Sequence, residues 1–337
     1  MTDETGLDRS TRWPYVHGEL GPYSYSRFDH PTGVAAERAL GELDGGQALL
    51  FASGMAAATA IVLGLSEPGK TIALGEGCYY GTTRLFEQLA PWGVRYLQYD
   101  QAGPPPDGAD LVWIEIPGNP LLTVPDIEAA AAHPAPVVCD ATAATPVLCR
   151  PLEHGVDVVL HSVTKYLGGH HDVLLGALVF GDEANHDRVK ATRMQTGAIA
   201  SPDSAWLLLR SLKTLEVRVL RQSETALELA RRLADHPRVE VARYPGLGPD
   251  PLAEQYMAGG YGGLLSFDVA DADAARRVES ATRLIANATS LGGVESTIEG
   301  RFRWEGDRVP PGLLRLSVGL EDVDTLWGDL DQALANA

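Results

Sequence analysis

The chain has 337 residues, of which 45% are hydrophobic and 21% charged, and this balance predicts a compact globular protein with room for two domains. It carries 45 acidic and 27 basic residues, a net charge of −18, which argues against nucleic acid or an anionic membrane surface as a partner. Three cysteines without a CxxC pair indicate neither a disulfide framework nor a zinc site. Because the N-terminus is polar and no apolar run is long enough for a bilayer, we expect a cytoplasmic protein.

Strand-like and helix-like segments alternate after a first stretch, residues 1–30, that lacks periodicity and is expected to form an extended arm. The predicted strands are 47–53, 71–75, 94–100, 111–117, 136–140, 157–162 and 174–180. The helices predicted between them are 53–65, 82–90 and 127–133. This alternation is typical of βα units and indicates an α/β fold with a buried, mostly parallel sheet.

The pattern changes in the last third of the chain. One long helical stretch is predicted from about 203 to 233, followed by shorter strands at 239–245, 262–269 and 282–290. Helices are expected near Ala274 and Leu326. The change near residue 220 predicts a large α/β domain over 31–220 and a smaller C-terminal α/β domain over 221–337.

Polar residues fall where several of the predicted strands end. Asp140 closes the strand 136–140, Asn119 lies just beyond the strand 111–117, and Lys165 follows the strand 157–162. In open α/β sheets, ligands bind outside the carboxyl ends of the strands. These residues are therefore candidates for a common site.

This set of residue types suits pyridoxal phosphate, which needs a lysine for a Schiff base and a carboxylate beside its pyridine nitrogen. Lys165 offers the amine, and Asp140 offers the carboxylate that would keep the nitrogen protonated. Donors for the phosphate are expected from a helix start and from two hydroxyls, namely Gly54, Met55, Ser162 and Thr164. Each residue alone is commonly a surface or turn residue, so the prediction depends on their joint order at successive strand ends.

The chain also resembles a known family, the Cys/Met-metabolism group of pyridoxal-phosphate enzymes, which includes cystathionine γ-lyase, cystathionine γ-synthase and methionine γ-lyase. The resemblance covers nearly the whole chain. It is carried by YSYSRFDHPT (23–32), ASGMAA (52–57), CYYGTTRLF (78–86), EIPGNPLL (115–122), HSVTKYLGGHHD (161–172), LLLRSLKTL (207–215), HPRVEVARYPGL (236–247), SLGGVES (290–296) and LLRLSVGLED (313–322). It implies an aspartate-aminotransferase-like fold (fold type I of the pyridoxal-phosphate enzymes).

The resemblance implies further site residues. Tyr79 is expected to stack on the cofactor ring and to act in proton transfer, while Asn119 and Thr142 contact the ring system. For the substrate, Arg315 is expected to bind the α-carboxylate, Asn119 to contact the substrate as well as the cofactor, and Ser290 to lie near both Lys165 and the substrate. Tyr25 and Arg27 are expected to reach the phosphate in a neighbouring subunit, so the resemblance implies a homo-oligomer with shared sites, a tetramer built as a dimer of dimers.

Some positions depart from the family pattern. These are His30 in place of the asparagine of NPT, Tyr80 in place of a glycine, Ala141 in place of the asparagine of DNT, and a replaced loop, TIEGRFRWEGDRVPPG, at 297–312. We expect the departures to cluster around the substrate pocket and to alter substrate choice.

The reaction that the resemblance favours is γ-elimination on a γ-substituted L-amino acid, as in cystathionine γ-lyase, a carbon–sulfur lyase of transsulfuration. Alternatives are γ-replacement as in cystathionine γ-synthase, a specialised γ-lyase of secondary metabolism with a non-sulfur leaving group, and a pseudo-enzyme that only binds the cofactor. Methionine γ-lyase fits less well, because its cysteine after the YG pair is Gly81 here. No metal is expected, since the adjacent His170 and His171 point apart in an extended chain and lack a third ligand at a suitable spacing.

Overall fold

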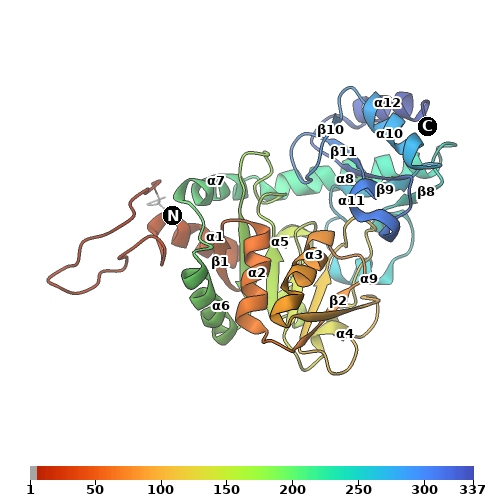
Figure 1. Cartoon of the computed structure of the whole chain (residues 1–337). Coiled ribbons are helices and arrows are strands. Elements are labelled where there is room, and N and C mark those ends of the chain that lie inside the picture. Colours follow the sequence, from red (N-terminus) through yellow and green to blue (C-terminus); the bar gives the residue numbers. More distant parts are fainter. Residues whose placement is uncertain (1–5) are drawn as a thin grey trace.

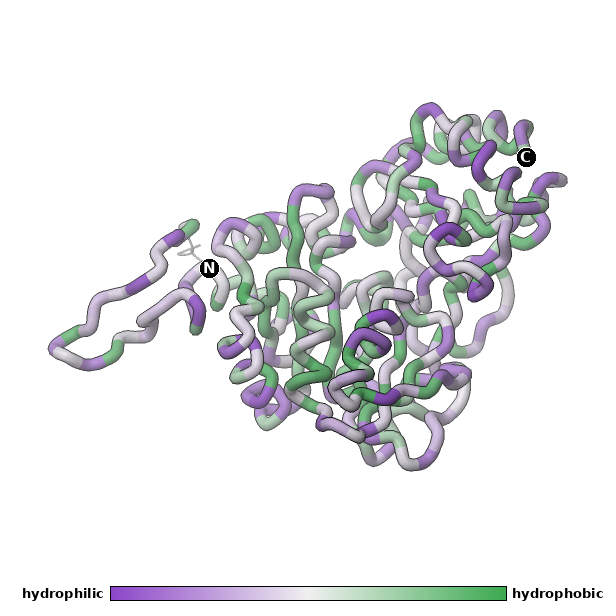
Figure 2. Tube along the Cα trace, in the orientation of Figure 1, coloured by the Kyte–Doolittle hydropathy of each residue, from purple (hydrophilic) through white to green (hydrophobic). Residues whose placement is uncertain are grey.

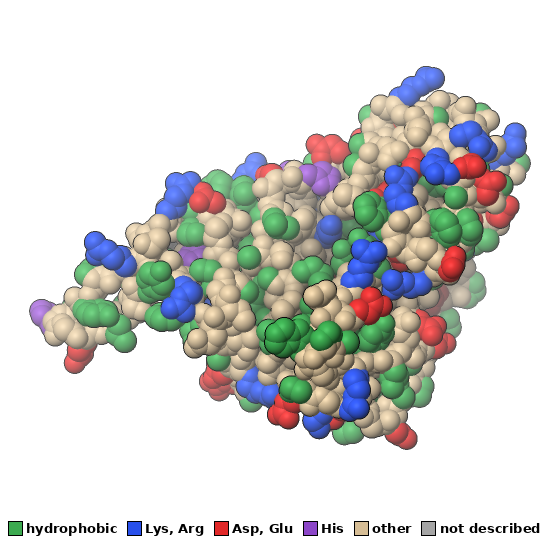
Figure 3. All heavy atoms as spheres, viewed as in Figure 1, with side chains coloured by type: hydrophobic (Ala, Val, Ile, Leu, Met, Phe, Trp, Pro, Cys, Tyr) green, Lys and Arg blue, Asp and Glu red, His purple; other side chains and the backbone are tan. Residues whose placement is uncertain are grey.

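The computed structural model describes residues 6–337, so the first five residues of the expected arm lie outside the described part of the chain. Residues 6–30 contain only isolated bridges, such as Arg12 with Tyr25, and they extend away from the body of the molecule (Figure 1). Several apolar side chains on this segment are exposed, among them Tyr15, Val16 and Leu20. Hydrophobic side chains are visible on the surface of the projecting segment in Figure 3.

A seven-stranded sheet forms the centre of the larger lobe, with strand order β1-β7-β6-β5-β4-β2-β3. Its strands are β1 (Gln47–Phe51), β2 (Thr71–Gly75), β3 (Arg95–Tyr99), β4 (Leu111–Glu115), β5 (Val137–Asp140), β6 (Val158–His161) and β7 (Gly176–Phe180). β7 runs antiparallel to both of its neighbours, and the remaining pairs are parallel. The predicted mostly parallel α/β sheet is confirmed.

Helices cover both faces of this sheet, which explains why its central strands β4, β5, β6 and β7 are buried throughout, whereas the edge strand β3 is partly exposed. The helices are α1 (Pro31–Asp44), α2 (Gly54–Leu65), α3 (Tyr80–Leu89), α4 (Ile127–Ala131), α5 (Thr145–Leu148), α6 (Glu183–Thr196) and α7 (Pro202–Leu212). Alternate residues of β4 serve different cores: Leu111 and Trp113 pack with α2 and α3, whereas Val112 and Ile114 face the other side. Figure 2 shows the hydrophobic residues concentrated around α2 and the strands behind it.

The long helix predicted for 203–233 is in fact two helices, α7 and α8 (Leu215–Ala234). The break is stabilised by polar contacts. The hydroxyl of Thr214 donates to the carbonyl of Ser211, and the buried Arg218 guanidinium reaches back to the same carbonyl. A carbonyl at the end of α7 is thereby paired, so the chain can turn without leaving it unsatisfied.

A smaller lobe contains a five-stranded sheet with order β10-β11-β12-β9-β8, and α8 leads into it from the larger lobe (Figure 1). Its strands are β8 (Val241–Arg243), β9 (Leu264–Asp268), β10 (Ala286–Asn287), β11 (Thr297–Gly300) and β12 (Leu313–Ser317). Its helices are α10 (Ala272–Ala281), α11 (Phe302–Glu305) and α12 (Val323–Leu334). A further short helix, α9 (Pro251–Tyr256), lies against the larger lobe, where the Tyr256 hydroxyl donates to Asp126 and accepts from the amide of Glu128 (Figure 1). No helix in residues 6–337 has the length and hydropathy needed to cross a membrane.

The strand predicted at 282–290 is wrong for most of its length, because only Ala286 and Asn287 pair. Both of these residues are exposed, so this edge has no buried face to extend it. The chain beyond them instead enters the junction between the two lobes, where Thr289 and Ser290 line a pocket.

Candidate active site

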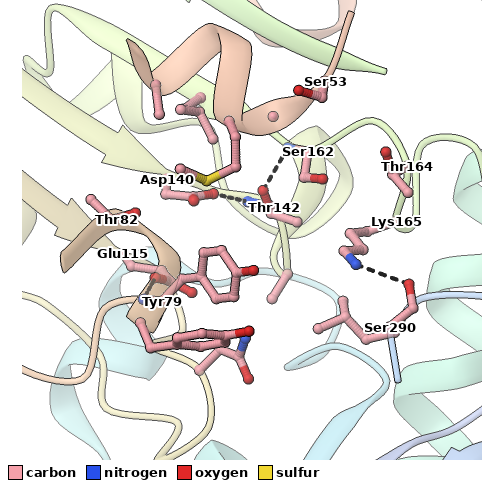
Figure 4. Close-up of a pocket in the computed structure, with 18 of the residues that line it drawn as sticks. Ser53, Tyr79, Thr82, Glu115, Asp140, Thr142, Ser162, Thr164, Lys165 and Ser290 are labelled. Atoms are coloured by element: carbon pink, nitrogen blue, oxygen red, sulfur yellow. Dashed lines mark hydrogen bonds between the residues drawn. The ribbon is translucent and has the colours of Figure 1, made fainter. Parts of the chain in front are cut away.

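A pocket lies at the carboxyl ends of β4, β5 and β6, beside the starts of α2 and α3, and is closed by residues of the smaller lobe (Figure 4). It brings together eleven of the residues predicted from the sequence: Gly54, Met55, Tyr79, Asn119, Asp140, Thr142, Ser162, Thr164, Lys165, Ser290 and Arg315. The positions therefore converge, although the sequence separates the first and last by more than half of the chain.

Lys165 stands in a turn after β6, where its amide donates to the carbonyl of Ser162. Its Nζ donates to Ser290 Oγ at 2.9 Å, a contact between the two lobes that Figure 4 displays. Burial, together with the nearby Arg315 and Arg301, lowers the pKa of the Lys165 amine to about 8. A fraction of this amine is therefore neutral near pH 7 and can act as a nucleophile or a base.

Ser290 is held in a left-handed conformation, with φ of 85°, which is uncommon for a residue other than glycine. Its side chain meets Lys165, and its carbonyl accepts a hydrogen bond from Arg315 Nη2 at 2.9 Å. The unusual backbone conformation lets Ser290 contact both the amine of Lys165 and the guanidinium of Arg315. Strained backbone conformations of this kind cluster at functional sites.

Two carboxylates lie side by side on the floor of the pocket, because Glu115 at the end of β4 is in register with Asp140 at the end of β5. Both are buried, and burial raises the pKa of each. Asp140 Oδ1 accepts from the amide of Thr142, and the hydroxyl of Thr142 in turn accepts from the amide of Ser162 at 2.7 Å. A buried carboxylate of this kind is stabilised when a cation binds beside it.

Glu115 is the functional candidate that the sequence analysis missed. Its Oε2 accepts a hydrogen bond from the amide of Tyr79, the residue before α3, whose own side chain makes no capping hydrogen bond. It thereby fixes the start of the helix and the position of the Tyr79 ring. The sequence did contain a signal for Glu115, because it is an acidic residue inside the apolar run LVWIEIP. Charged residues are almost never fully buried unless they are paired.

The Tyr79 ring packs at an angle of 68° against the ring of Tyr80, with the centroids 4.9 Å apart. Burial and the neighbouring Tyr80 raise the pKa of the Tyr79 hydroxyl to about 12. Tyr79 is therefore a proton donor rather than a phenolate at neutral pH.

At the opposite end of the pocket, Ser53 caps α2 by accepting from the amide of Ala56 at 3.1 Å. The start of this helix approaches Ser162 so closely that a Cβ on Gly54 would lie 3.1 Å from the Ser162 side chain. Glycine thus leaves the first amides of α2 accessible, and helix starts favour anions. The Thr164 hydroxyl donates to the carbonyl of Leu175, so its proton is already engaged.

Arg315, on β12, is buried with its guanidinium directed into the pocket. It donates to Asn119 Oδ1 at 3.0 Å and to Glu299 Oε2 at 3.1 Å, in addition to Ser290. Burial, and the proximity of Arg301, lower the pKa of Arg315 to about 10, so it remains a cation at neutral pH. A planar guanidinium in this position is suited to a carboxylate.

Two predicted residues do not reach this pocket within the chain. Tyr25 and Arg27 lie on the N-terminal segment, where Arg27 Nη1 donates to the carbonyl of Met194 at 2.9 Å and its guanidinium packs over the rings of Tyr25 and Phe28. Their expected contact with a neighbouring subunit stays a prediction.

We expected the positions that depart from the family pattern to cluster around the substrate pocket, and this expectation is wrong for two of them. His30 caps α1, since its Nδ1 accepts from the amide of Gly33 at 3.0 Å and its Nε2 contacts the carbonyl of Ala200. Ala141 is fully buried in the core, because its neighbours Asp140 and Thr142 take the positions that face the pocket. Tyr80 and Arg301 do line the pocket.

The residues present fit pyridoxal phosphate. The buried Asp140 suits the pyridinium nitrogen, the open start of α2 suits the phosphate, and Lys165 lines the same pocket. Tyr79 also lines this pocket.

Comparison with known proteins supports the same cofactor. Residues 7–335 match the family model of the Cys/Met metabolism PLP-dependent enzymes. The chain is 41% identical to cystathionine gamma-synthase of Mycobacterium tuberculosis, over 95% of this chain and 88% of that protein. Among solved structures, metB from Corynebacterium glutamicum superposes with a TM-score of 0.95 at 37% identity, covering 99% of this chain and 93% of the other. CalE6 of Micromonospora echinospora, described as a cystathionine gamma lyase, gives 0.92 at 36% identity, covering 98% and 93%.

Proposed function

We propose that this chain, which belongs to the Cys/Met metabolism PLP-dependent enzymes, catalyses γ-elimination on a γ-substituted L-amino acid and cleaves a carbon–sulfur bond. Bound pyridoxal phosphate supplies an electron sink for negative charge that develops at the substrate Cα. The observation that carries the proposal is the placement of the Lys165 amine 2.9 Å from Ser290, in a pocket shared with Arg315 and Tyr79.

Each residue has a proposed task. Arg315 binds the substrate α-carboxylate, and its contacts to Asn119 and Ser290 fix its plane. Lys165, with a pKa lowered to about 8, removes the Cα proton as a general base. It passes this proton on, to the bound cofactor or to water, and can then accept a Cβ proton. Tyr79, with its pKa raised to about 12, donates a proton to the leaving thiolate. Asp140 would keep the cofactor's pyridine nitrogen protonated, and the start of α2 with Ser162 would bind its phosphate.

A second candidate is γ-replacement, in which a thiol adds after the leaving group departs. It is supported by relatives named cystathionine gamma-synthase, at 41% identity in Mycobacterium tuberculosis. The two reactions share every residue assigned above and differ in whether a thiol adds to the γ-carbon before any product is released.

The test is a panel of cystathionine, homocysteine, an O-acyl homoserine and a γ-halogenated amino acid, each with and without cysteine, with products identified by mass. γ-Elimination predicts a 2-oxo acid and ammonia from the amino acid alone. Product that forms only when cysteine is present would overturn it in favour of γ-replacement. The variant Lys165→Ala should abolish either reaction.

The organisation of the whole protein is also a proposal. We divide the chain into an arm (1–30), a cofactor-binding domain (31–220) and a C-terminal domain (221–337), with the second boundary falling inside α8. We propose a homotetramer in which Tyr25 and Arg27 complete the phosphate site of a neighbouring subunit; the projecting segment with its exposed apolar side chains supports this. Three free cysteines are compatible with a cytoplasmic setting.

A further inference from the structure

A buried cluster of two guanidiniums and two carboxylates adjoins the carboxylate-binding end of the pocket. Arg301 and Arg315 are 2% and 4% exposed, and Glu299 and Glu305 are 4% and 8% exposed. Glu299 Oε2 lies 2.7 Å from Arg301 Nη1 and 3.1 Å from Arg315 Nη2, so one carboxylate oxygen is shared by both arginines. The cluster is neutral in formal charge, as a buried group of this size requires.

Most of this cluster comes from the segment in which the chain departs from its family. Arg301 precedes α11, and Trp304 and Glu305 belong to it. Trp304 Nε1 donates to Glu299 Oε1 at 2.7 Å, and Glu305 Oε1 accepts from Arg301 Nε at 3.0 Å. The segment thus holds both oxygens of Glu299 and supplies a second carboxylate that fixes Arg301.

This arrangement creates a conflict at Arg315. Its Nη1 donates to Asn119 and its Nη2 to both Ser290 and Glu299. An incoming substrate carboxylate that engages the guanidinium with two oxygens needs a donor that Glu299 occupies. Glu299 is therefore an internal anion that competes for Arg315, and its release depends on how well another cation holds it.

We propose that Arg301 is a positioning residue for substrate binding, which retains Glu299 when the α-carboxylate of the amino acid takes its place on Arg315. The proposal rests on the assignment of Arg315 under the proposed function. Glu299 is closer to Arg301 than to Arg315, so we expect it to stay paired with Arg301 when the substrate binds. The hydrogen bonds between Arg301 and Glu305 and between Trp304 and Glu299 hold this pair together. Arg301 acts through Glu299 and need not touch the substrate.

The test uses the charge-neutral double variant Arg301→Gln with Glu305→Gln, which leaves Glu299 to Arg315 and Trp304. We expect KM for the amino acid to rise about tenfold, equivalent to about 1.4 kcal/mol. Because loss of Arg301 also removes one of the cations that lower the Lys165 pKa, kcat is compared on its high-pH plateau, where it should change less than about twofold. Adding Glu299→Gln to this variant removes the competing anion, so KM should return toward the wild-type value. The pair Arg243 and Asp268, which does not line the pocket, provides the matched control: Arg243→Gln with Asp268→Asn should leave KM unchanged.

A binding measurement separates this proposal from the proposed function. Butyrate carries a carboxylate without an amine, and its dissociation constant for the holoenzyme, measured by calorimetry, should rise in the double variant and recover in the triple one. If Arg301 only stabilised the fold, the double variant would show a lower kcat, and butyrate affinity would not recover in the triple variant. Either result would overturn the proposal. If the double variant does not fold, Trp304→Phe removes one bond to Glu299, and an unchanged butyrate affinity there would also overturn it. Failure of γ-elimination in the wild type, with the butyrate pattern intact, would refute only the proposed reaction.

Discussion

The lowered pKa of Lys165 makes a quantitative prediction about cofactor attachment. An amine with a pKa of about 8 is about one quarter neutral at a pH of about 7.5, whereas an ordinary lysine with a pKa of about 10.4 is neutral in about one molecule in a thousand. Only the neutral amine attacks a carbonyl, so the ratio of the two neutral fractions predicts that the buried lysine reacts about 200-fold faster than an exposed one. The cause is burial first, and the cations Arg315 and Arg301 second.

The assay starts from apoprotein and follows the rate of pyridoxal phosphate attachment by absorbance between about pH 6.5 and pH 10. The rate should rise with pH and level off above a midpoint near 8. Exposed Lys70 serves as the internal control, because its hydrogen bond to Asp110 raises its pKa, and borohydride trapping should label it far less than Lys165 at neutral pH. A rate that still climbs tenfold per pH unit up to about pH 10 would refute the reasoning, since it would show an unperturbed lysine.

Three further predictions address the cofactor, the fold and the assembly. Asp140→Asn should retain the fold, judged by circular dichroism, and lower kcat by about 100-fold or more, because a preorganised charge is lost; near-normal turnover would contradict its role. His30→Ala should lower the free energy of unfolding by about 1 kcal/mol through loss of the cap on Gly33, whereas His30→Asn should be close to wild type in a denaturant titration, and equal values for the two would contradict the capping role. Mixing inactive Arg27→Ala with inactive Lys165→Ala subunits should restore activity, since some mixed sites are complete; a fully active monomer in light scattering would disprove shared sites.

Much of the larger lobe could be predicted because its signals are local. Apolar runs such as LVWIE form strands buried on both faces, and Gly54 and Ser53 mark the start of α2. In a parallel sheet the strand ends share one edge, so the order along the chain was enough to bring Asp140, Asn119 and Lys165 together.

Other features were missed because their signals are not local. β11 pairs with β12, and β10 pairs over only two residues, because of strands that lie elsewhere in the chain. The break between α7 and α8 depends on Arg218, which reaches back from α8 to a carbonyl at the end of α7. His30 looked like a change at the substrate pocket, yet the backbone turns it toward Gly33 to cap α1.

The α/β class could be read from the sequence because it follows from periodicity. The sequence also indicated candidate cofactor residues, some from the residue types at strand ends and others from the family resemblance. Only the tertiary structure decided that Glu115 anchors the amide of Tyr79 and that Glu299 lies between Arg301 and Arg315. The physical reason is that a charged residue in an apolar segment shows only that it needs a partner. Which partner it finds is set by packing between segments that are far apart in the chain.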